Sequence, residues 1–142
     1  MYSRFEFLQA MLIRGSRRNQ DMPEADKSPE RKVQLLTKEC TVEGRQFVIT
    51  LLPFPNGCFV SISEDEKQRL GSITLSVRSA GHAISSPLIP ESKGSLFASM
   101  VGEMLAEGLG GMAVTSMYLR SEIGASCMKT LISEVRKLLE TG

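Results

Sequence analysis

Between residues 33 and 78, apolar and polar residues alternate with the period of two that is typical of β-strands. Two such runs, in the stretch 33–54, lie on either side of Glu43 and Gly44, and a glycine there permits the positive φ of a tight hairpin. A third run, GCFVSIS, follows a turn cluster at residues 53–57 that contains two prolines. These three runs predict three successive strands.

The clearest alternation is in a fourth run, LGSITLSV. One face of it carries Ile73, Leu75 and Val77, and the other carries Ser72, Thr74 and Ser76. This pattern predicts a strand with one apolar face and one wet face, as in an antiparallel sheet. Four strands joined by short turns predict a meander, in which the charged connector EDEKQR is a hairpin tip. We expect residues 78–94 to be irregular, because they are rich in Gly, Pro and Ser.

After residue 94 the period becomes helical, with one broad apolar stripe formed by Leu96, Phe97, Met100, Val101, Met104 and Leu105. The run MAVTSMYL returns to the period of two, and a last helix follows, with Ser121 as its expected N-cap. The predicted fold class is therefore α+β, in the order ββββαβα. An antiparallel meander sheet of five to six strands packs against two helices.

The chain divides by composition into a flexible N-terminal tail, residues 1–33, and a single α+β domain, residues 34–142. The tail combines a basic start with a polar segment broken by Pro23 and Pro29, which is typical of a linker. Its arginines and its single early acid, Glu6, also leave open an organelle transit peptide.

Charge, hydropathy and cysteine content argue against several classes of protein. Among 142 residues, 17 Lys and Arg nearly balance 16 Asp and Glu, so the charge pattern does not indicate a nucleic-acid-binding protein. No apolar run approaches the ~20 residues that span a bilayer, so we expect no membrane association. Cys40, Cys58 and Cys127 lie far apart and outside any CxxC pair, which indicates buried thiols in a reducing compartment.

The glycine-rich stretch Gly108-Leu109-Gly110-Gly111 resembles a phosphate-binding loop only in composition. Such loops follow a strand and open a helix, because the helix N-terminus supplies amides and positive potential. Here the predicted helix precedes the glycines and a strand follows them, so the glycines meet the negative end of the helix. We predict a helix C-cap.

Candidate catalytic chemistry is sparse, and we predict no catalytic residues, no cofactor and no metal site. His82 is the one histidine, and the sequence contains no GxSxG nucleophile elbow and no HExxH spacing. An enzyme that uses His82 with a serine or cysteine remains one alternative. The charged run is the candidate protein-binding loop, consisting of Glu64, Asp65, Glu66, Lys67 and Arg69.

Three stretches carry a resemblance to a known family, namely KECTVEGRQFVIT, NGCFVSISEDEKQRLGSITLSV and the C-terminal stretch that runs from SLFASM to RKLL. In element order and in scattered residues from Leu36 to Leu139, the chain resembles the third proteasome-assembly chaperone of eukaryotes (the proteasome assembly chaperone 3 family). The resemblance implies a non-enzymatic α+β protein whose six-stranded antiparallel sheet lies between helices.

The same resemblance implies partners. Members of the family dimerise, typically with a related fourth chaperone, and bind α-subunits of the 20S core particle while the α-ring forms. They leave before maturation. For this chain we predict no nucleic-acid, membrane or small-molecule partner. We therefore expect a cytoplasmic chaperone, with the nucleus as a second compartment, acting as a heterodimer or a homodimer. The alternative is a small α+β dimeric adaptor in another protein complex.

Overall fold

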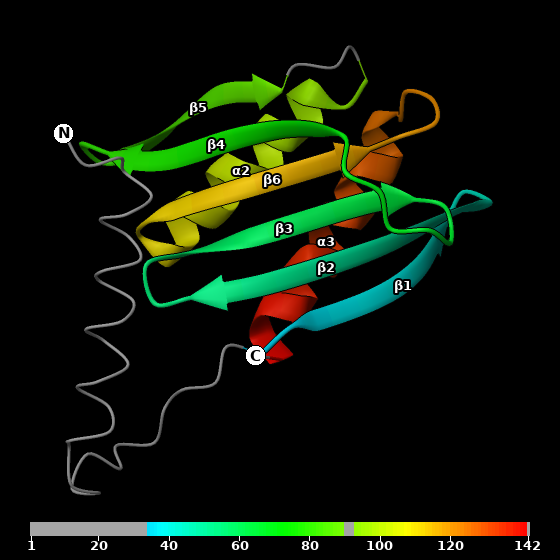
Figure 1. Ribbon diagram of the computed structural model, residues 1–142, viewed down its shortest axis with the longest axis horizontal. Coiled ribbons are helices and arrows are strands. Elements are labelled where there is room, and N and C mark those ends of the chain that lie inside the picture. The colour runs from blue at the N-terminus through cyan, green and yellow to red at the C-terminus, as the bar shows by residue number, and fades with distance from the viewer. Residues whose placement is uncertain (1–33, 90–92, 142) are drawn as a thin grey trace, which may run out of the picture. The chain divides into compact units, whose positions relative to one another are not determined.

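The computed structural model describes residues 34–89 and 93–141, so the predicted tail 1–33 lies outside the described residues. In chain order the elements are β1 (Leu36–Val42), β2 (Arg45–Phe54), β3 (Gly57–Glu64), β4 (Ser72–Ser79), β5 (His82–Ile89), α2 (Ser95–Leu109), β6 (Met112–Tyr118) and α3 (Ala125–Thr141). The α+β class, the two helices and a sheet of six strands in the described part of the chain are confirmed (Figure 1).

The sheet is mixed and is not a simple meander, because its strand order is β1-β2-β3-β6-β4-β5. Strand β6 lies between β3 and β4, parallel to β3 and antiparallel to β4. The segment between Glu64 and Ser72 is therefore not a hairpin tip. It is a connection that passes the end of β6, and the Gly71 N–H there donates to Ser116 Oγ at 3.2 Å.

Two hairpins use the same two-residue turn. Glu43 and Gly44 have φ values of 53° and 76°, which confirms the predicted β1–β2 hairpin with both central residues in the left-handed region. Ala80 and Gly81, with φ of 49° and 92°, form an equivalent turn that begins β5 at His82. The prediction of an irregular segment was therefore wrong.

Strand β5 tolerates proline because of its place in the sheet. Pro87 lies on the edge strand, paired with Thr74, next to a register shift between Ile73 and Thr74. A proline has no N–H to donate, and an edge strand tolerates this at a bulge or where the N–H would point away from its one neighbouring strand. Proline content alone was thus a poor guide to this segment.

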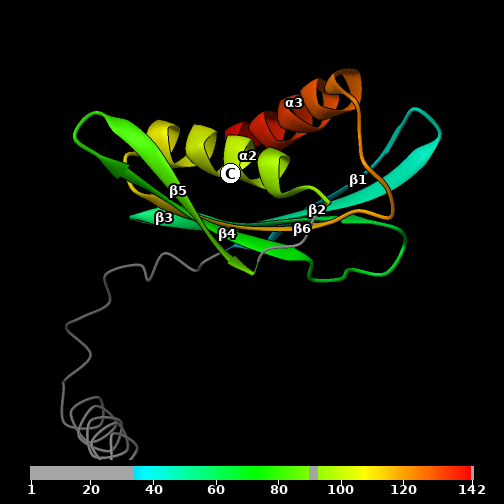
Figure 2. The ribbon, with the colours of Figure 1, turned by 90° about the horizontal axis from the view of Figure 1, so that it is seen from above.

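Both helices cover the same face of the sheet, as Figure 2 shows from above. Helix α2 packs mainly on β4, β5 and β6, whereas α3 packs on β1 and β2. The core lies between the helices and the sheet. Its largest fully buried side chains are Phe47, Phe97, Ile49, Leu51, Ile62, Leu105, Met117 and Leu131.

The ends of the helices test two predictions, the glycine cap after α2 and the Ser121 N-cap of α3. Gly110 adopts φ 67° just past α2, where its N–H donates to Glu107 O and the Gly111 N–H donates to Ala106 O, so the predicted glycine cap is confirmed. Helix α3 begins at Ala125, where the Met128 N–H reaches Gly124 O, so Ser121 is not the N-cap.

Candidate protein-binding surfaces

The first residue of the predicted binding loop, Glu64, is buried in an ion pair. Its carboxylate accepts from Arg45 Nε at 2.7 Å and Arg45 Nη2 at 2.6 Å, in the bidentate geometry that makes such pairs strong. The Arg120 N–H adds a third bond at 2.7 Å. These donors hold the pKa of Glu64 below its ordinary value, with the Arg45 hydrogen bonds as the largest cause. Glu64 therefore joins Arg45 to the Arg120 backbone inside the fold. Its expected role in binding a partner remains a prediction.

The Arg45 guanidinium also holds the segment that leads into α3. Its Nη1 donates to Glu122 O at 3.0 Å and its Nη2 donates to Ser121 O at 2.9 Å. One side chain thus joins the start of β2, the end of β3 and the β6–α3 connection. Because Arg45 lies 19 residues before Glu64 and 77 before Glu122, only the folded chain brings these groups together.

The rest of the loop, Asp65–Arg69, is held at its base and exposed at its surface. Asp65 accepts from the Glu66 N–H, pairs with Arg120, and has its pKa lowered chiefly by that backbone bond. Ser63 Oγ donates to Lys67 O at 3.1 Å and accepts from the Arg69 N–H at 2.9 Å. The side chains of Glu66, Lys67 and Arg69 remain exposed. A loop with a fixed backbone and exposed charges can present them to another protein.

Strand β4 turns its apolar side chains away from the helices. Ser72, Thr74 and Ser76, at most 1% exposed, pair with the core-facing positions of β6 and lie under α2. The prediction of a wet serine face was therefore wrong. The reason is steric: α2 crosses β4 at Gly102, where a Cβ would collide with Ser76 Oγ and lie 3.0 Å from Thr115 Oγ1. Such close packing leaves room only for small side chains.

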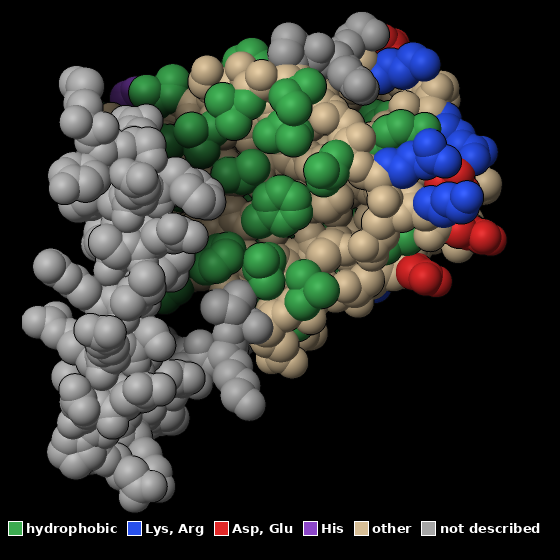
Figure 3. All heavy atoms as spheres, viewed as in Figure 1, with side chains coloured by type: hydrophobic (Ala, Val, Ile, Leu, Met, Phe, Trp, Pro, Cys, Tyr) green, Lys and Arg blue, Asp and Glu red, His purple; other side chains and the backbone are tan. Residues whose placement is uncertain are grey.

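Neighbouring strands continue this apolar surface, which none of the described helices covers. We call it the open face; by strand register its apolar side chains include Leu52, Phe54, Phe59, Ile73, Leu75, Val77, Ile84, Met112 and Val114. Figure 3 shows apolar side chains gathered across this face and charged ones gathered at one end. Phe54, Ile84 and Met112 are 45%, 59% and 43% exposed.

The open face is the surface that the sequence reasoning missed. Its signal was the apolar run FVITLLPF in β2, which places apolar residues on both faces of one strand. The predicted apolar face of this strand contains only Phe47, Ile49 and Leu51. A strand that is apolar on both faces indicates two buried surfaces, and here the described helices cover only one of them.

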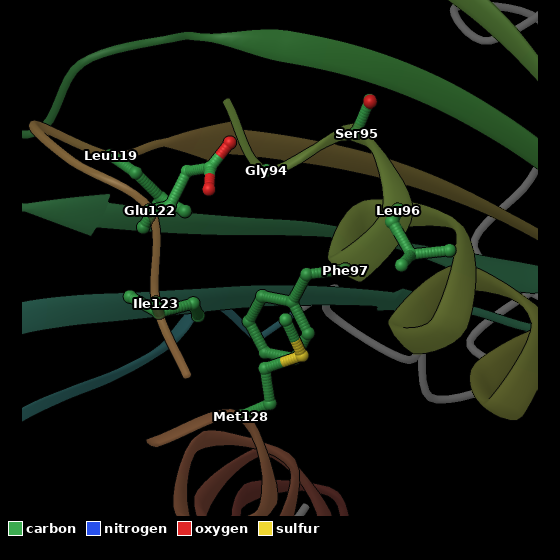
Figure 4. Close-up of a pocket in the computed structure, with 8 residues that line it drawn as sticks. All are labelled: Gly94, Ser95, Leu96, Phe97, Leu119, Glu122, Ile123 and Met128. Carbon is green, nitrogen blue, oxygen red and sulfur yellow. The ribbon is translucent and has the colours of Figure 1, made fainter. Parts of the chain in front are cut away.

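A cavity of about 200 Å³ lies where α2 and α3 begin (Figure 4). Phe97 from α2 and Met128 from α3 point toward each other across it, and Leu119 and Ile123 from the β6–α3 connection line its side. The single carboxylate in its lining is that of Glu122. This mainly apolar lining suits packing against a hydrophobic group.

His82 and the cysteines of the enzyme alternative lie apart in the fold. His82 is exposed at the start of β5, opposite Ser79, whereas Cys40 lies on β1 at the other edge. Cys58 and Cys127 are buried, as expected, and Cys40 is half-buried. Burial raises the pKa of Cys58 to about 11, which disfavours its nucleophilic thiolate. The described residues contain no cluster of three metal-ligating side chains.

Within residues 34–89 and 93–141, no helix is both long and apolar enough to cross a bilayer. No family model and no curated protein matches the sequence. Among solved structures, the fold is similar to a chain in the crystal structure of a chaperone complex for yeast 20S proteasome assembly. The TM-score is 0.60 at 10% sequence identity, and the match covers 77% of this chain and 96% of the yeast chain. The protein thus shares its fold with a component of that chaperone complex.

Proposed function

We propose that this protein is an assembly chaperone of the 20S proteasome, acting as a dimer with a related chaperone chain. The dimer binds α-subunits while the α-ring forms. The observation that carries the proposal is the open face, because it supplies the interface that a dimer of this fold needs. The fold likeness to the yeast chaperone chain supports the choice of complex.

The open face suits a second sheet. Two sheets pack face to face about 10 Å apart, with the side chains of both inner faces interdigitating. The apolar open-face residues lie on β2 to β6, whereas the corresponding positions of β1 are Thr37, Glu39 and Thr41. The surface is therefore apolar from β2 to β5 and polar along its β1 edge; protein interfaces likewise combine an apolar core with polar margins. Contiguous apolar patches on a protein surface often mark sites of protein–protein contact.

A face-to-face dimer leaves the charged loop accessible. Gln68 Nε2 donates to Thr50 Oγ1 at 3.1 Å, so the loop lies over one end of the open face. Its exposed charges, Glu66, Lys67 and Arg69, are then at the rim of the dimer interface. We propose that they contact an α-subunit, because charged groups at a rim steer partners and set specificity.

Capture of tagged protein from cells tests this function. We expect α-subunits and a second chaperone chain in proteasome precursors, and neither in mature, proteolytically active particles that are captured with it. Absence of α-subunits from both fractions would overturn the proposal. Recovery of a different stable complex would instead favour the small dimeric adaptor.

Open-face variants test the dimer separately. Ile84→Lys with Met112→Lys places two charges at exposed positions, so the fold should persist while the dimer is lost. The matched control is Ser133→Lys, on the exposed surface of α3. Sedimentation velocity should show a monomer for the open-face variant and a dimer for the control. Equal dimerisation of both would show that the interface lies elsewhere.

We also propose a cytoplasmic location. The three described thiols are free, as they are in reducing compartments. Cell fractionation tests this proposal, and recovery of the protein in an organelle with a shortened N-terminus would favour the transit-peptide alternative.

A further inference from the structure

A second unpartnered surface lies on the opposite side of the molecule, between the two helices. Helices α2 and α3 pack on different strands of the sheet more than on each other, which leaves a groove between them. An open cavity of about 750 Å³ lies in this groove, beside the C-terminal halves of the two helices. It is lined from α2 by Met100, Glu103 and Met104 and from α3 by Arg136 and Leu139. The smaller cavity in Figure 4 lies at the other end.

The outer surface of α2 is apolar where a surface helix is usually charged. Leu96 is 70% exposed and Met100 is 43% exposed, and they follow each other at a spacing of four along one stripe. The opposite side of α2 is buried in the core through Phe97, Val101 and Leu105. A helix that is apolar on both sides is typically covered on both. The methionines beside the groove add side chains that adapt to a packed partner.

The charges of α2 indicate the chemistry of that partner. The helix has two charged residues, Glu103 and Glu107, and no basic residue in its last turn. Glu107 lies in the last turn, near the negative end of the helix dipole, where a carboxylate is unfavourable, and Glu103 lies one turn before it. Within the described part of the chain, neither of them forms an ion pair, and Glu107 accepts only a 3.4 Å bond from the Ala83 N–H.

The basic side chain that lines the cavity from α3, Arg136, forms no ion pair with these acids. Arg136 Nε points to Met104 Sδ at 3.2 Å, a weak acceptor. Since Glu103 and Glu107 form no ion pair within the described residues, basic side chains of a partner can pair with them. A basic group is consequently favoured in the occupant.

We propose that this groove binds an amphipathic helix of a partner protein. The apolar stripe of that helix packs on Leu96, Met100 and Met104, and its lysine or arginine side chains pair with Glu103 and Glu107. Helix-in-groove binding requires this combination of an apolar channel and a complementary charged edge. The groove is on the far side of the sheet from the open face, so the proposal goes beyond dimerisation and does not depend on it.

Model helices test the groove directly. The probe is a fluorescein-labelled 18-residue peptide of leucine and lysine with one apolar face, and its counterpart carries glutamate in place of lysine. Measured by fluorescence anisotropy near 0.15 M salt, the lysine peptide should bind about tenfold more tightly than the glutamate peptide. The double variant Glu103→Lys/Glu107→Lys should reverse this order. The control Glu39→Lys/Glu43→Lys makes the same change in charge away from the groove and should preserve the order.

Amide chemical-shift mapping then locates the bound lysine peptide. We expect shifts on α2 and α3, and a loss of at least tenfold in affinity for the variant Leu96→Lys/Met100→Lys, whose exposed positions tolerate charge without unfolding. Equal affinity for the two peptides, shifts confined to the open face, or no binding at millimolar peptide would each overturn the proposal. None of these results bears on whether α-subunits co-purify.

Discussion

Gly102 of α2 lies directly against the Ser76 hydroxyl of β4, at a distance that leaves no room for a Cβ. Ser76 Oγ also bonds Ser85 Oγ on β5 at 2.8 Å, so the hydroxyl beneath the helix has a partner. This contact lets α2 approach the sheet closely over small polar residues. It also explains why the apolar side chains of β4 face the other way.

Gly102→Ala should destabilise the protein although alanine favours helices. The added methyl group meets Ser76 Oγ and Thr115 Oγ1, and overpacking of this kind costs about 1–3 kcal/mol. Urea unfolding followed by circular dichroism measures the effect. The control is Gly108→Ala in the same helix, where a Cβ meets nothing within 4 Å and a gain of up to about 1 kcal/mol is expected. If both substitutions stabilise the fold, the close packing is wrong.

Glu64→Gln should lower the free energy of unfolding at pH 7 by roughly 2–3 kcal/mol, because it breaks a buried, charge-assisted hydrogen-bonded pair with Arg45. The folded-state pKa of Glu64 lies below its unfolded value. The stabilisation is therefore present above the unfolded pKa, near 4.3, and is lost as the pH falls through the lower folded pKa.

Unfolding measured from pH 7 to pH 2 tests this dependence. The difference between wild type and Glu64→Gln should shrink at the acid end. The neighbouring Glu66→Gln removes the same charge at an exposed position and should change stability by less than about 0.5 kcal/mol. A difference that stays constant with pH would contradict the assignment to the Arg45 pair.

Cys58 should resist alkylation in the folded protein. With a pKa of about 11, roughly a thousandth of the thiol is ionised at pH 8, and the side chain is 5% exposed. Iodoacetamide labelling followed by peptide mass spectrometry should therefore modify half-buried Cys40 before Cys58. In denaturant all three cysteines should react at similar rates. Rapid native labelling of Cys58 would show that β3 opens to solvent.

His82→Ala should leave both stability and partner binding unchanged. The side chain is exposed at the β4–β5 hairpin and makes no side-chain hydrogen bond within the described residues. Co-purification of α-subunits, compared with wild type at matched expression, measures the effect. Loss of function in a variant that remains folded would revive the enzyme hypothesis based on this histidine.

The sequence pattern predicted the features that are formed by residues close together in the chain, such as turns, helix caps and helix faces. The β1–β2 hairpin followed from Gly44, the α2 cap from Gly110, and the helical stripes from their spacing. The position of β6 did not follow, because parallel pairing with β3 carries no local signal. The Ala80-Gly81 turn had such a signal, which the Pro and Ser content of β5 obscured.

The candidate binding surfaces were likewise predictable only where they depend on residues that are close in the sequence. The charged loop was visible as a run of charged residues, but burial of Glu64 depends on Arg45 and on the Arg120 backbone far along the chain. The alternation in β4 was identified correctly, and only its direction was wrong. Which face of an amphipathic strand meets the helices is decided by a contact such as Gly102 with Ser76, which a period of two does not encode.

The insertion of β6 between β3 and β4 has a consequence for how the chain folds as it is synthesised. The three-stranded unit β1–β2–β3 and the hairpin β4–β5 can each form early. They are not paired with each other, because β6 (Met112–Tyr118) lies between β3 and β4. A nascent chain that ends before this point is thus two separate pieces with unpaired edges, which are prone to aggregate. Because β6 follows the other five described strands in the sequence, the open face becomes one continuous surface only after Met112–Tyr118 has been made.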